Sequence, residues 1–247
     1  MNSLSALTLL GLGFVFGLKH ATEVDHVVAV SAIVSEQRNL LRSALIGALW
    51  GAGHTAALIV VGILVLGLRI TIPARVAPWL EFGVALMIIG LGASALIRAL
   101  RRRAAMHIHR HSHDNLTHVH LHFHEREDAA ASAAPTHEHA VSRLGFKPFL
   151  VGAMHGLAGS SALTLLILAQ LDSTVLGLVY LGVFGIGSIC GMLLMSGLIG
   201  LPFALTARRV NGIHYGLQTL AATVSIIFGL WYAYETVIAN GLLKTML

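Results

Sequence analysis

Long apolar runs alternate with short polar connectors along most of the chain. Six runs are long enough to cross a hydrocarbon core, which takes roughly 20 apolar residues per helix. The runs cover residues 3–35, 43–67, 78–100, 147–171, 174–205 and 213–240. The predicted fold class is therefore an all-α, polytopic membrane protein of about six transmembrane helices, with seven as the nearest alternative count. The first and fifth runs are long enough to be tilted, kinked or partly re-entrant.

Composition supports a membrane protein rather than a water-soluble domain. Hydrophobic residues make up 56% of the 247 residues and charged residues only 11%, whereas a soluble domain has about a quarter charged residues. The one cysteine, Cys190, lies in an apolar run, which excludes disulfides within the chain and thiolate metal clusters. Because Lys19 is the first positive residue, the first run lacks the features of a signal peptide and is expected to be retained.

Lys and Arg residues are concentrated in alternate connectors. Six spans place loops 36–42, 101–146 and 206–212 on one side of the membrane, and 12 of the 16 Lys and Arg residues lie in or beside these loops. The positive-inside rule then predicts a multi-pass protein of the cell (inner) membrane, with 101–146 cytoplasmic and both termini outside. Since the basic residues flank apolar runs, the expected partner is the lipid bilayer, and no nucleic acid is expected.

The two halves of the chain resemble each other at a shift of about 135 residues. Similarity at a fixed shift is the sequence signature of an internal repeat. Residues 17–20 align with 152–155, and 50–54 align with 184–188. Three spans in each half would invert the second copy in the membrane, as in many secondary transporters, and would place a site near the midplane. The predicted organisation is a first transmembrane repeat over 1–100, a flexible His-rich cytoplasmic loop over 101–146 and a second transmembrane repeat over 147–247.

Residues 19–26 interrupt the first apolar run with five ionisable side chains, in the order Lys-His-Ala-Thr-Glu-Val-Asp-His. An Asp or Lys at the bilayer centre costs roughly 2.5–3.5 kcal/mol even on mild insertion scales, so such residues persist where they face a cavity, pair with each other or bind an ion. Histidine with carboxylate suits divalent Ni, Co, Zn or Fe better than Ca or Mg. The run therefore predicts a transition-metal site.

Helical geometry restricts which of these residues can be ligands. In a regular helix Asp25 lies about 140° from His20 around the axis, and His26 lies about 240° from it. His20, Asp25 and His26 can bind one ion only if the helix is broken between His20 and Asp25. In a straight helix His20, Glu23 and His26 share a face, which makes Glu23 the alternative to Asp25. Two further interpretations are that Asp25 orients an imidazole and that 19–26 is a surface loop between short spans.

Two more histidines in apolar runs are candidate metal ligands. His54 lies in a Gly-His-Thr sequence in the second run, and His155 lies in the fourth. A single histidine on an apolar helix can also be a hydrogen-bonded core residue, and both positions keep that alternative. As a ligand, His155 would complete the coordination shell from the second half.

The connector 101–146 is rich in histidine among Asp, Glu, Arg and Ala. Such tracts are typical of metal binding, because neutral imidazole is available to coordinate at cytosolic pH. Alternation over 118–124 would place imidazoles on one side of an extended strand. We interpret the loop as a flexible ion buffer or sensor, with a solvated linker as the alternative. Its histidines are His107, His109, His111, His113, His118, His120, His122, His124, His137 and His139.

These motifs resemble the nickel/cobalt permease family, whose hallmark is H-x4-D-H in a membrane span. Residues 20–26 fit that pattern, and 53–55 are similar to the family's Gly-His-Ser/Thr motif. Residues 190–196 resemble G-M-x-x-M-D, but Ser196 stands where Asp is expected, and the motif L-G-F-D-T-A-T-E has no clear match. The family has an additional N-terminal span, which we do not expect among the six apolar runs given above, and related exporters also carry a His-rich cytoplasmic loop.

The resemblance implies uptake of Ni²⁺ or Co²⁺ for urease, hydrogenase or cobalamin enzymes. We predict a secondary transporter rather than an enzyme, since neither a nucleotide-binding loop nor H-E-x-x-H occurs. The divalent ion would be the transported substrate, with no permanently bound cofactor. Efflux and a non-translocating metal chaperone are the alternatives, and the oligomeric state is open, a homo-oligomer included. The predicted metal residues are His20, Asp25, His26, His54, Glu23 and His155.

Overall fold

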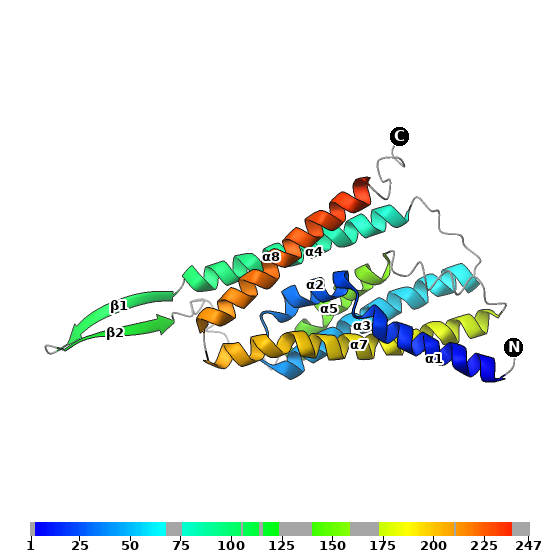
Figure 1. The fold of residues 1–247 in the computed structure, drawn as a ribbon, viewed down its shortest axis with the longest axis horizontal. Helices are drawn as coiled ribbons and strands as arrows, with labels where there is room; N and C mark the ends of the chain where they lie inside the picture. The colour runs from blue at the N-terminus through cyan, green and yellow to red at the C-terminus, as the bar shows by residue number, and fades with distance from the viewer. Residues whose placement is uncertain are drawn as a thin grey trace.

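The computed structural model describes residues 3–67, 76–104, 106–113, 116–123, 140–158, 173–209 and 211–238. Long helices dominate, and a β-hairpin projects from one end (Figure 1). In chain order the elements are α1 (Ser3–His20), α2 (Val24–Val34), α3 (Leu40–Gly62), the π-helical turn η1 (Ile63–Gly67), α4 (Ala77–Ala104), β1 (Met106–His113), β2 (Leu116–Phe123), α5 (Ala140–Gly156), α7 (Thr174–Arg209) and α8 (Asn211–Ile238).

Several of these helices are long and apolar enough to cross a membrane. Within the described residues, α3, α4, α7 and α8 each meet this requirement, and α1 and α2 meet it together as one span bent by 53°. The protein is therefore a multi-pass membrane protein. The predicted fourth span begins within α5, but residues 159–172 lie outside the described part, so the count of six spans stays a prediction.

The helices pack in pairs around the short helix α2. α3 packs against α7, α1 packs against α7, α5 packs against α3, and α4 packs against α8. In Figure 1, α4 and α8 lie side by side above the other helices, and α2 lies between the two groups. The buried core includes Val30 and Val34 of α2, Trp50 of α3 and Ile88 of α4. The broken first span is thus held in place from several sides.

Glycines let the backbones of paired helices touch at corresponding places in the two halves. A Cβ on Gly17 of α1 would lie 2.1 Å from the carbonyl oxygen of Phe184 in α7. A Cβ on Gly152 of α5 would lie 2.0 Å from the carbonyl oxygen of Trp50 in α3. The alignment of the halves pairs Gly17 with Gly152 and Phe184 with Trp50. The same contact between a glycine and a backbone carbonyl therefore occurs in both halves. A second duplicated contact joins Gly53 to Phe149 and Gly187 to Phe14.

The His-rich segment contains regular structure outside the membrane helices. β1 and β2 pair as an antiparallel hairpin, in which three histidines of β1 are register partners of three histidines of β2. The all-α prediction therefore holds for the membrane part, whereas the segment predicted as a flexible loop contains two strands. The alternation over 118–124 predicted an extended strand, and β2 covers most of that range. The register pairs are His107 with His122, His109 with His120 and His111 with His118.

Candidate metal centre

The first membrane span is broken at the ionisable sequence. α1 ends at His20 and α2 begins at Val24. The amides of Thr22 and Glu23 bond to the carbonyls of Lys19 and His20, three residues back, and the Thr22 hydroxyl also donates to the Lys19 carbonyl over 2.6 Å. The helical ladder therefore ends here, and Glu23 takes an extended conformation as the N-cap of α2. This is the broken helix that would let His20 and Asp25 approach one site.

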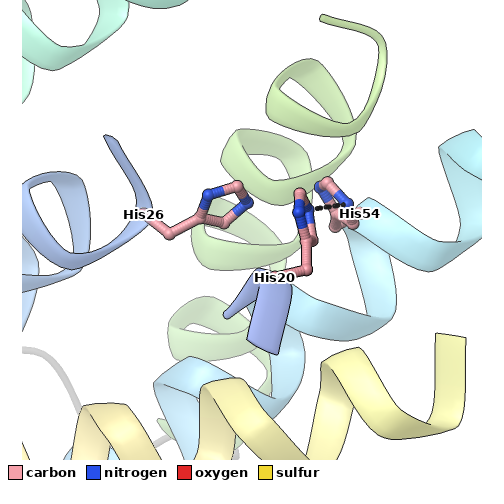
Figure 2. Close-up of side chains that lie close together, drawn as sticks. All are labelled: His20, His26 and His54. Atoms are coloured by element: carbon pink, nitrogen blue, oxygen red, sulfur yellow. Dashed lines mark hydrogen bonds between the residues drawn. The ribbon is translucent and has the colours of Figure 1, made fainter. Parts of the chain in front are cut away.

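The break brings three histidines from three helices together. Figure 2 shows the rings of His20 from α1, His26 from α2 and His54 from α3 turned toward one another. His20 Nε2 lies 2.9 Å from His54 Nε2, and one nitrogen from each of the three rings lies within 4.8 Å of the other two. A tetrahedral ion with nitrogen ligands at about 2.1 Å separates them by about 3.4 Å. The nitrogen atoms therefore need to approach one another by at most about 1.4 Å, and the 2.9 Å separation between His20 and His54 needs to open slightly.

A second group shares His26 with the first. Asp25 Oδ1 lies 3.0 Å from His26 Nδ1, and Asp25 Oδ2 lies 2.8 Å from His155 Nε2 of α5. The rings of His26 and His155 are 4.0 Å apart between centroids. Asp25, His26 and His155 thus form another set that could hold an ion. The carboxylate of Asp25 joins the first span to the second half of the chain.

Hydrogen bonds to carboxylates indicate which histidine nitrogens keep a free lone pair. Asp25 is the acceptor for His26 Nδ1–H, which leaves a free lone pair on Nε2 of that ring. Glu23 Oε2 lies 3.1 Å from His20 Nδ1, which leaves His20 Nε2 as an acceptor for the N–H of His54. Among the described residues, His26 Nε2, His54 Nδ1 and His155 Nδ1 are buried without a hydrogen-bond partner. Buried polar atoms are normally satisfied, so these nitrogens fit a site for a ligand.

The site residues predicted from the sequence lie in one place. Five of the six belong to the two groups, while Glu23 contacts the site only through His20 and is 46% exposed. The four histidines are 0–5% exposed. The alternative of a surface loop over 19–26 is therefore wrong for the histidines, and it fits only Glu23 and its exposed neighbours.

Sequence reasoning missed the aromatic and acidic residues of other helices around this cluster. Phe184 of α7 and Trp50 of α3 lie within 6 Å of the rings of His20 and His155, respectively. Tyr232 and Glu235 of α8 line a cavity with Asp25. Glu235 carried a usable signal, because it is a lone carboxylate in an apolar run. The aromatic residues carried none, since aromatic side chains are ordinary in such runs.

Neutral imidazoles and carboxylates in a buried setting suit a divalent transition metal ion. Imidazole is a good ligand for Ni, Co, Zn, Cu and Fe, and geometry rather than ligand type separates them. The carboxylates supply negative charge close to the histidines without occupying their coordinating atoms. The side chains at the break of the first membrane span therefore have the chemistry of a dication site.

Known proteins include a close relative of the whole chain. The urease accessory protein UreH of Bacillus sp. (strain TB-90) is 36% identical, in an alignment that covers 99% of this chain and 98% of that protein. The chain belongs to the UreH family. Two chloroplast proteins of Arabidopsis thaliana, FOR GROWTH AND FERTILITY 1 and 2, are 27% and 26% identical over 91% of this chain, which spans 58% and 55% of their lengths. No protein-family model and no solved structure matches the chain.

Proposed function

We propose that this UreH-family protein is a secondary transporter that carries nickel across the cell membrane into the cell. The observation that carries the proposal is the convergence of His20, His26 and His54 at a break in a membrane span. Ionisable residues at such a place are typical of an ion pathway. Nickel is the first candidate because the full-length relative is named a urease accessory protein and urease is a nickel enzyme. Cobalt is the second, by resemblance to the nickel/cobalt permeases.

We assign different roles to the six residues of the cluster. His20, His26 and His54 bind the ion through ring nitrogens. Asp25 orients His26 and His155 rather than binding the ion first, because both of its oxygens are already bonded to these rings. Glu23 orients His20 in the same way. Carboxylates behind metal-bound imidazoles fix the tautomer and raise the basicity of the ligand.

The transport step would be a rocking of two inverted repeats. Duplicated glycine contacts support this, because Gly17 meets Phe184 as Gly152 meets Trp50. α3 and α7, which correspond in the alignment, run in opposite directions in Figure 1, as do α4 and α8. A site between the repeats then opens to one side at a time. By the positive-inside rule, the hairpin end of the bundle faces the cytoplasm.

The test is uptake of radiolabelled nickel into proteoliposomes. His20→Gln and His26→Gln should each abolish flux, because each removes a coordinating nitrogen. His214→Gln is the matched control, since His214 is also a buried histidine of the membrane part, 3% exposed, but bonds to Thr206 and Gln218 and belongs to neither metal-ligand group. Flux at the normal level in both cluster variants would overturn the proposal. Stoichiometric nickel binding by the purified protein without flux would favour the chaperone, and export from loaded vesicles would favour efflux.

A further inference from the structure

A cavity lies directly beside the cluster, between the start of α2 and the end of α8. Its volume is about 420 Å³, and only one residue of the cluster, Asp25, lines it. The other lining residues are Val24, Phe228, Trp231, Tyr232 and Glu235. In Figure 1 this end of α8 points away from the hairpin. The cavity therefore reaches the cluster from the end of the bundle opposite the hairpin.

Asp25 connects the buried histidines of the cluster to this cavity. His26, His54 and His155 are 0–1% exposed, whereas Asp25 is 18% exposed. One nitrogen of each of these three histidines is buried without a hydrogen-bond partner, and none of the three histidines lines the cavity. Among the described residues, an ion that approaches through the cavity would therefore meet Asp25 before it meets a buried histidine.

Negative charge gathers around the same cavity. Tyr232, in its wall, lies close enough to Glu81, Asp25, Glu235 and Glu23 to interact electrostatically with all four carboxylates. Outside 101–146 the chain has six acidic residues. The remaining two are Asp172, outside the described residues, and Glu36, which pairs with Arg98 near the hairpin end. The carboxylates of the described membrane part are thus concentrated where a cation would enter.

We propose that this cavity is the route by which the metal ion enters from the end opposite the hairpin, and that Glu235 is the carboxylate that draws the ion in. The inference rests on the proposed transport function and identifies where the transported ion enters the protein. A cleft with one sign of charge and low-dielectric walls focuses the field and raises the local concentration of counter-ions. Phe228, Trp231 and Tyr232 supply those walls. Glu235 draws the ion toward the side of the cluster where Asp25 lies and does not belong to the histidine site.

The first experiment neutralises Glu235 with Glu235→Gln and compares Glu36→Gln, which removes the same charge at the other end. Nickel uptake by Glu235→Gln should lose about tenfold in kcat/KM at low salt through a raised KM, with kcat unchanged. The loss should shrink as salt shortens the Debye length from about 10 Å at 0.1 M to about 3 Å at 1 M. The equilibrium nickel affinity in detergent should not change. A defect equal to that of Glu36→Gln, or one insensitive to salt, would overturn the role of Glu235.

The second experiment fills the cavity. In a Cys190→Ala background, Trp231→Cys places a thiol in the cavity wall and Leu230→Cys places one on the same helix outside it, at positions 54% and 56% exposed. Both are labelled with a bulky maleimide before reconstitution, and labelling is verified by mass spectrometry. The label should abolish flux at 231 and spare flux at 230. Equal flux through both labelled proteins would overturn the route. If His26→Gln still abolishes flux in that case, the proposed transport function stands without this entrance.

Discussion

Asp25→Asn tests whether the carboxylate orients the histidines or binds the ion itself. The substitution keeps the shape of the side chain and removes its charge. One carboxylate oxygen becomes an NH₂ group, which cannot accept a hydrogen bond. The side chain can then no longer accept from His26 and His155 on separate oxygens. One of these rings must therefore lose its acceptor, rotate or change tautomer, and a buried N–H without an acceptor costs about 1–3 kcal/mol.

The expected magnitude follows from the three contacts that Asp25 makes. Its Oδ1 accepts the backbone amide and the Nδ1 of His26, each over 3.0 Å, and its Oδ2 accepts His155 Nε2 over 2.8 Å. Loss of a carboxylate behind a metal-bound imidazole typically lowers metal affinity 10- to 100-fold, or about 1.4–2.8 kcal/mol. We expect Asp25→Asn to weaken nickel binding by this amount while His20, His26 and His54 still bind the ion.

Isothermal titration of the purified protein with nickel measures this loss. His26→Gln serves as the reference for the loss of a true ligand, and thermal unfolding in detergent checks that both variants are folded. An affinity loss for Asp25→Asn as large as that of His26→Gln would refute the orienting role and make Asp25 a direct ligand. Unchanged affinity would refute the orienting role as well, because the imidazoles would then need no carboxylate.

Three further predictions concern packing, protons and the hairpin. Gly53→Ala should destabilise the protein by about 1–3 kcal/mol, because the new Cβ would lie 1.9 Å from the Phe149 carbonyl oxygen. Thermal unfolding measures this loss. Gly83→Ala is the control, because its new Cβ would meet nothing within 4 Å. Equilibrium nickel affinity should fall as the solution is acidified, because a protonated imidazole nitrogen cannot bind the ion, and titrations at a series of pH values check this. Deletion of 106–140 should leave flux at saturating nickel unchanged and lower the number of ions bound per chain.

Much of the cluster could be predicted from the sequence because its chemistry is local. Five ionisable residues within 19–26 are costly in hydrocarbon, so a functional site was the natural interpretation. The angle of about 140° between His20 and Asp25 on a regular helix made a broken helix one of two explicit alternatives. The structure shows the broken helix, with α1 ending at His20 and α2 starting at Val24.

The contacts between distant segments could not be predicted with the same detail. Asp25 and His155 are 130 residues apart in the chain, and only the weak internal repeat suggested that they meet. The choice between Asp25 and Glu23 also depended on tertiary contacts. Both carboxylates bond to histidines, but only Asp25 reaches the second half of the chain. No period or spacing within the first span encodes that difference.

The hydrogen bond between His20 and His54 would favour transport over storage. His20 Nε2 and His54 Nε2 lie 2.9 Å apart and share a hydrogen bond, so an incoming ion must break that bond before it can use both nitrogens. His54 must also move its proton to Nδ1, a buried atom without a partner in the described part of the chain. Each step subtracts from the affinity that three imidazoles would otherwise supply. An ion whose ligands must first give up a hydrogen bond would bind less tightly and could therefore leave on the other side of the membrane.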